Sequence, residues 1–96
     1  MIRSFRHKGL AELFGRGLSA KVRADLRERA LRRLDVLNAA SELSQLTVPG
    51  FDFHPLRGFK PTRYSLHVNG PWRITFEWAE GDALRVDLEQ YHEEPA

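Results

Sequence analysis

Residues 63–78 decide the fold, and they read RYSLHVNGPWRITFEW. Apolar and polar side chains alternate on both sides of the Asn69-Gly70 pair. A period of two is the pattern of a strand with one buried and one polar face, and Asn-Gly is favoured at the centre of a type I′ hairpin turn. These residues therefore predict an antiparallel hairpin, although Pro71 makes its turn less standard.

The same alternation continues towards the C-terminus. Gly81-Asp82 marks a second turn, after which Leu84, Val86 and Leu88 alternate with polar residues. We expect a meander of antiparallel strands with one apolar face that other elements must cover. Its polar face is predicted to present Arg63, His67, Arg73, Thr75, Arg85 and, by parity, Tyr91.

The first half of the chain has a helical pattern. Its apolar stripe repeats every three or four residues and consists of Val22, Leu26, Ala30, Leu34 and Leu37. This spacing predicts a helix over residues 19–38 with Ser19 as its N-cap. We also expect a short strand over residues 2–6, a short helix over residues 7–17, and one more turn at Leu43 and Leu46. Helices that cover one face of an antiparallel sheet form a two-layer α+β domain, here residues 1–96.

Residues 49–62 connect the helical half to the strands. They contain three prolines and two glycines, yet also four large apolar side chains, Phe51, Phe53, Leu56 and Phe59. A long connection without regular structure in a small domain is usually functional or disordered. The apolar side chains predict that this one is packed against the core.

The composition excludes several classes of protein. The chain of 96 residues has no cysteine, so disulfides and thiolate chemistry are absent. No apolar run exceeds two residues, which is too short for a transmembrane helix or a secretory signal. The four histidines have no paired spacing of the kind that metal sites use. We therefore expect a cytoplasmic protein that needs no metal and no cofactor.

Positive charge is unevenly distributed along the chain, although the net charge is only +2. The segment of residues 53–76 contains no acid and holds His54, Arg57, Lys60, Arg63, His67 and Arg73. Such local concentration suits a phosphate-bearing partner. The alternative is that these side chains only solvate the surface.

Histidine, tyrosine and arginine side chains without an obvious catalytic carboxylate suit one reaction, the cleavage of RNA by its own 2′-hydroxyl. This reaction needs a base, cations around the phosphorane and an acid for the leaving oxygen. His54 and Arg73 are candidates, and His92 joins them if the strand ends or bulges near Gln90. The alternatives are packing roles for the histidines and a structural ion pair between Arg73 and Glu77 or Asp87.

Five blocks of the sequence together resemble the HigB host-inhibition toxins of the RelE/ParE superfamily. They are MIRSF (residues 1–5), HKGL (residues 7–10), HPLRG (residues 54–58), WRITF (residues 72–76) and Tyr91-His92. The resemblance implies a RelE-like α+β fold and an endoribonuclease that cleaves messenger RNA on the translating ribosome. It also implies a HigA-like helix-turn-helix antitoxin as partner, with operator DNA bound only through that antitoxin.

The resemblance also implies which residues act. The catalytic positions are His54, Arg73, Tyr91 and His92, and Arg57 is expected to hold phosphate together with Lys60 and Arg63. Gln90 stands where HigB enzymes often have an acid, and its amide can orient a neighbour but cannot accept a proton.

Three alternatives concern function and partner surface. ParE-type relatives share the fold but inhibit DNA gyrase, and a weakened toxin would act mainly in an antitoxin–repressor complex. The helix over residues 19–38 is a candidate antitoxin surface through Arg23, Arg27 and Arg33, or is plain solvated surface.

Overall fold

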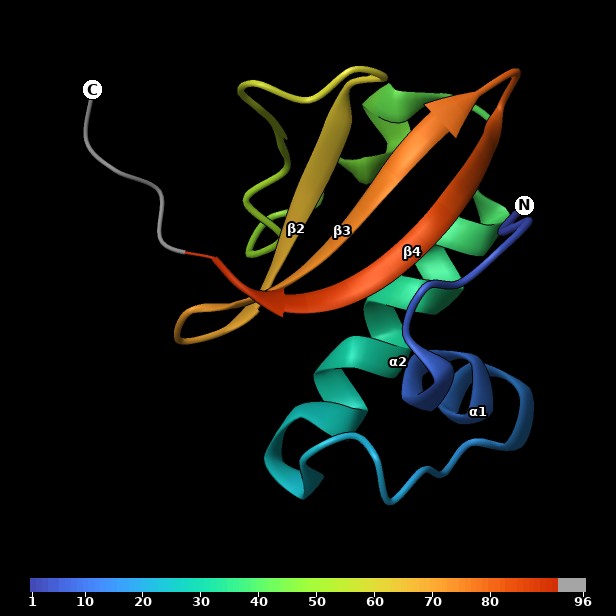
Figure 1. The fold of residues 1–96 in the computed structure, drawn as a ribbon, viewed down its shortest axis with the longest axis vertical. Coiled ribbons are helices and arrows are strands. Elements are labelled where there is room, and N and C mark those ends of the chain that lie inside the picture. Colours follow the sequence, from blue (N-terminus) through green and yellow to red (C-terminus); the bar gives the residue numbers. More distant parts are fainter. Residues whose placement is uncertain (92–96) are drawn as a thin grey trace.

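The computed structural model describes residues 1–91 and has two layers (Figure 1). One layer is an antiparallel sheet in the order β1-β2-β3-β4. Its strands are β1 (His54–Leu56), β2 (Arg63–Asn69), β3 (Trp72–Ala79) and β4 (Asp82–Gln90). The other layer holds α1 (Lys8–Arg16), α2 (Ala24–Ala39) and the 3-10 helix η1 (Leu43–Leu46). The predicted α+β architecture is confirmed, and no helix within residues 1–91 is long and apolar enough to cross a membrane.

The core lies between α2 and the sheet. The predicted stripe on α2 is buried, with Leu26, Ala30, Leu34 and Leu37 at most 1% exposed. The sheet contributes Leu66, Val68, Ile74, Phe76, Val86 and Leu88 to the same cluster, and α1 adds Leu10 and Leu13. In Figure 1, α2 passes behind the strands and leaves their opposite face uncovered by helices.

Helix α2 starts later than the sequence predicts. Its N-cap is Arg23, so the expected cap at Ser19 is wrong. The Ser19 hydroxyl donates to Glu12 (2.8 Å) and accepts the Lys21 N–H (3.1 Å). Because these bonds tie the hydroxyl to α1 and to the turn before α2, it is not available to cap α2.

The first residues run beside β4 without forming a strand (Figure 1). Two isolated parallel bridges, Ile2↔Ala83 and Phe5↔Val86, replace the short strand expected over residues 2–6. The chain then enters α1, where the His7 imidazole accepts the Leu10 N–H as an N-cap.

A bulge in β4 changes which side chains face the core. Arg85 has a φ of +48°, and the register shifts so that Thr75 pairs with Asp87 but Glu77 pairs with Leu84. The extra residue inverts the alternation before the bulge. Ala83 is therefore fully buried, whereas Leu84 shares the face of Glu77, and the predicted inward position of Leu84 is wrong.

The type I′ conformation predicted for the β2–β3 turn is absent there, and the β3–β4 turn has the positive φ angles that it requires. Strand β2 ends at Asn69 and β3 begins at Trp72, so Gly70 and Pro71 are the central residues of the turn. Of Asn69 and Gly70, only Gly70 has a positive φ (+56°), so the Asn69-Gly70 pair does not form a type I′ turn. Positive φ at both central residues, which type I′ requires, occurs instead at Glu80 (+54°) and Gly81 (+81°).

The connection over residues 49–62 is packed at one end only. Phe51 and Leu56 are buried, and Phe53 stacks on Tyr64 with ring centroids 5.6 Å apart. Phe59, by contrast, is 42% exposed, so its predicted burial is wrong.

Candidate active site

The cross-strand register assembles three rows of side chains on the polar face of the sheet. The first row is His54↔Ser65↔Thr75↔Asp87, the second is His67↔Arg73↔Glu89, and the third is Arg63↔Glu77. Residues directly opposite each other in antiparallel strands lie within side-chain contact. The register confirms the predicted polar face for Arg63, His67, Arg73 and Thr75, and it brings His54 into the row next to that of Arg73.

Arg73 is held on this face by three hydrogen bonds, although only 7% of the residue is exposed. Its Nε donates to the Ser65 hydroxyl, its Nη1 to the Asp52 carboxylate (3.2 Å) and its Nη2 to the Asp52 backbone carbonyl (2.6 Å). The alternative of an ion pair with Glu77 or Asp87 is wrong, because the acid that pairs with Arg73 is Asp52.

Asp52 is the functional candidate that the sequence analysis missed. Its Oδ2 is 3.2 Å from Arg73 Nη1 and 3.8 Å from His54 Nε2, so one carboxylate lies beside both candidate catalytic groups. Its φ of +46° belongs to the left-handed region, where Asp and Asn are enriched among non-glycine residues. The available sequence clue was proximity alone, because Asp52 is two residues before His54.

His54 and Tyr91 occupy different parts of the site. His54 begins β1, its side chain is 20% exposed, and its Nδ1 is 3.1 Å from the Pro55 carbonyl. Tyr91 follows β4, is half-buried and donates its N–H to the Pro71 carbonyl (2.8 Å). Gln90 is exposed, and the candidate His92 lies outside the described residues.

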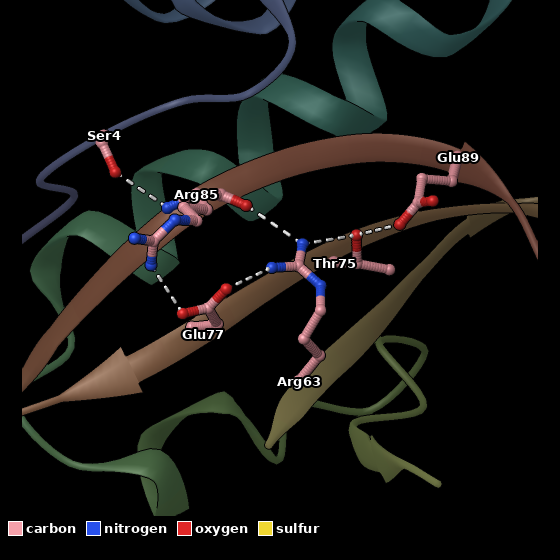
Figure 2. A network of polar contacts seen from close by, with 6 residues as sticks. All are labelled: Ser4, Arg63, Thr75, Glu77, Arg85 and Glu89. Atoms are coloured by element: carbon pink, nitrogen blue, oxygen red, sulfur yellow. Dashed lines mark hydrogen bonds and ion pairs between the residues drawn. The ribbon is translucent and has the colours of Figure 1, made fainter. Parts of the chain in front are cut away.

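Arg63 is the centre of a buried network at the other end of the polar face (Figure 2). Its guanidinium donates to Glu77 (3.1 Å), to the Thr75 hydroxyl (3.0 Å) and to the Arg85 carbonyl (3.0 Å). Glu77 also accepts from Arg85 (2.8 Å). Since Arg63 is only 3% exposed, this geometry does not present it to a phosphate, and the expected phosphate-binding role does not fit.

Arg57 and Lys60 are placed differently. Both are exposed in the connection between β1 and β2, which begins directly after the strand of His54. Their exposure leaves both cations accessible to the phosphates of a bound nucleic acid.

The candidate antitoxin surface on α2 differs from the prediction. Arg33 is 6% exposed, donates to the His67 carbonyl (2.6 Å) and lies 4.5 Å from the Phe51 ring centroid. Burial, with Arg29 and Arg32 nearby, lowers the pKa of the Arg33 guanidinium. Arg33 is therefore a structural residue, and its predicted availability to a partner is wrong.

The other two arginines predicted for that surface remain accessible. Arg23 is exposed and pairs with Asp25 (2.8 Å), and the half-buried Arg27 donates to the Val22 carbonyl (2.8 Å). Helix α2 also has a polar hollow lined by Asp25, Glu28, Arg29, Arg32 and Arg33.

The small two-layer α+β fold agrees with the RelE-like fold that the sequence resemblance implies. The family model described as HigB-like toxin, the RelE-like toxin of type II toxin-antitoxin system HigB, matches residues 3–92. The chain therefore belongs to the HigB-like toxin family, whose members are paired with an antitoxin.

Two curated relatives agree with this assignment. The chain is 39% identical over 92 residues to the endoribonuclease HigB of Proteus vulgaris, a match that covers 96% of this chain and 100% of that protein. It is 38% identical over 66 residues to toxin HigB-1 of Vibrio cholerae serotype O1, which covers 67% of this chain and 70% of that protein.

Proposed function

We propose that this toxin is an endoribonuclease that cleaves messenger RNA on the translating ribosome. The observation that carries the proposal is the joint position of His54 and Arg73 around Asp52, which combines a proton-transfer group with a positioned cation. In the reaction, the 2′-oxygen of RNA forms a bond to the adjacent phosphorus while the bond to the 5′-oxygen breaks. A base takes the 2′-proton and an acid protonates the leaving oxygen, which gives a cyclic phosphate end.

Each residue has one role in this proposal. His54 and His92 are the base and acid, because a neutral imidazole can accept a proton and a protonated one can donate it. Arg73 stabilises the charge that develops on the phosphorane. Tyr91 donates a hydrogen bond from its phenol to the phosphate. Gln90 orients its neighbour.

The remaining roles concern binding. Arg57 and Lys60 hold flanking phosphates, whereas Arg63 supports the sheet beneath them. The partners in this proposal are the ribosome and its message in the cytoplasm, and a helix-turn-helix antitoxin of the HigA type that alone contacts operator DNA. Arg23 and Arg27, without the buried Arg33, form the candidate antitoxin surface.

The test is inducible expression in bacteria without the antitoxin, followed by primer extension on cellular messages. We expect growth arrest with cuts inside translated reading frames. His54→Ala should reduce cleavage by about 10²–10⁴-fold and should abolish the arrest. Arrest with intact transcripts and gyrase trapped on DNA would favour the gyrase alternative, and no arrest despite tight antitoxin binding would favour the weakened toxin.

A further inference from the structure

The ion pair between Arg73 and Asp52 joins a buried cation to an exposed anion. The Arg73 side chain is 9% exposed, whereas the Asp52 side chain is 67% exposed. The Asp52 carboxylate is therefore already largely hydrated, and turning it away from Arg73 leaves no buried charge on the acid. Because water and salt reach its anionic member, this pair is weaker than a fully buried ion pair.

Arg73 does not depend on that carboxylate for its position. Its Nε is bonded to the Ser65 hydroxyl and its Nη2 to the Asp52 backbone carbonyl at 2.6 Å. Only Nη1 is bonded to the carboxylate, at 3.2 Å. An anion that replaced the carboxylate would thus meet a guanidinium that is already oriented. The only change would be the acceptor of the Nη1 hydrogen bond, from a carboxylate oxygen to an oxygen of the new anion.

A phosphate oxygen accepts the same N–H bond as a carboxylate oxygen, in the same geometry. The left-handed backbone of Asp52 (φ +46°) keeps its carboxylate beside both Arg73 Nη1 and His54 Nε2, which is where the proposed reaction places the scissile phosphate. The two anions would compete for this position.

We propose that the Asp52 carboxylate occupies, in the free toxin, the position of a phosphate oxygen on Arg73 and is displaced by RNA. This inference rests on the proposed function for the identity of the anion. Asp52 is a positioning residue: it neutralises Arg73 until a phosphate of the substrate replaces it, which lowers the affinity of the free site for anions.

The experiment measures binding without cleavage. A fluorescent single-stranded oligonucleotide with 2′-O-methyl sugars lacks the attacking hydroxyl, and its dissociation constant is measured by anisotropy. Asp52→Asn keeps the shape and tolerates positive φ, and it should lower the dissociation constant about two- to fivefold. Asp35→Asn on the exposed face of α2 makes the same charge change and should leave binding nearly unaltered.

A double-variant comparison isolates the role of Arg73. In an Arg73→Gln background, Asp52→Asn should no longer tighten binding, because the cation for which the two anions compete is gone. Unchanged or weaker binding by Asp52→Asn in the wild-type background would overturn the proposal. So would an equal gain in both backgrounds, which would indicate a general charge effect.

Steady-state kinetics on a cleavable substrate adds a second readout. Asp52→Asn should lower KM more than it changes kcat. A loss in kcat of about 10²-fold at unchanged affinity would instead make Asp52 a proton-transfer group and would overturn the proposal. If Asp52→Asn is poorly folded, Asp52→Gly, which adopts positive φ freely, repeats the measurement. Tighter binding through Arg73 in a protein that cleaves no RNA would refute the proposed function and leave the competition at Arg73 standing.

Discussion

Arg63 and Arg73 lie on the same face of the same sheet and are both nearly buried, with exposures of 3% and 7%. Their acidic partners differ: the Glu77 side chain is 11% exposed, whereas the Asp52 side chain is 67% exposed. Arg63 is therefore fixed inside a closed network, and Arg73 faces a partner that can leave. The burial of an arginine does not reveal its role, but the exposure of its partner does.

The cost to stability of removing the arginine also differs between the two pairs. Removing one member of a buried pair leaves a charge without compensation and is strongly destabilising. When the arginine of a pair is removed and its acidic partner is exposed, water hydrates that acid and the cost to stability is small. We expect variants of Arg63 to change stability and variants of Arg73 to change turnover.

Among variants of the two arginines and their surroundings, the largest effect is expected for Arg73→Lys. Lysine keeps the charge but lacks the planar fork that bonds Ser65 and Asp52 together, so it cannot hold the same orientation towards a phosphorane. Turnover should fall about 10²–10³-fold, the cost of losing one positioned charge-stabilising group. Single-turnover cleavage and oligonucleotide binding, measured together, check this. A loss of binding as large as the loss of turnover would contradict a transition-state role.

The next effect concerns the closed network. Arg63→Met should lower the free energy of unfolding by about 2–4 kcal/mol, because Glu77 keeps Arg85 but loses its buried partner. Urea unfolding followed by tryptophan fluorescence measures the change. Arg73→Met is the matched control and should cost less, because Asp52 turns to water. Equal losses for the two variants would remove the distinction between the networks.

A smaller effect is expected where the polar face meets solvent. Arg57→Ala and Lys60→Ala each remove one exposed cation that is assigned to a phosphate. Each should reduce the slope of log affinity against log salt by about 0.7 for single-stranded RNA and leave stability nearly unchanged. Arg63→Met should leave the salt slope as it is. A wild-type affinity that does not change with salt would refute these phosphate contacts.

The sequence predicted the elements wherever one periodicity continued without interruption. The stripe of α2 and the alternation of β2 and β3 are both local patterns, and the structure confirms them. The errors arise where a side-chain contact or a break in the strand register overrides the periodic pattern. Glu12 engages the Ser19 hydroxyl, and a bulge at Arg85 moves Leu84 off the core face.

The candidate site was predictable only in part for the same reason. Alternation placed Arg73 on the polar face, but nothing local to Arg73 indicates that its partner is Asp52, 21 residues earlier in the chain. Nor does the sequence show that Arg63, with the same parity and charge, is enclosed by Glu77 and Thr75. The position of a residue in the strand alternation predicts which face of the sheet it lies on. Its exposure depends on the side chains from other strands that surround it.

The smallest predicted effect lies far from the site, where the N-terminus is tied to the β3–β4 turn. Asp82 accepts from Arg3 Nε (2.8 Å) and lies 3.2 Å from the N-terminal amino group. The hydrogen bonds from Arg3 and the amino group hold the pKa of the Asp82 carboxyl below its ordinary value. A pKa that is lower in the folded state contributes stability above the unfolded pKa, and the contribution disappears as the pH falls through the folded one.

Wild type should thus be more stable than Asp82→Asn at pH 7, and the difference should shrink below about pH 5. Urea unfolding of both proteins at several pH values tests this, and Arg3→Ala should reduce the difference at neutral pH. A difference that stays constant on acidification would show that Asp82 acts through the turn alone and not through its charge.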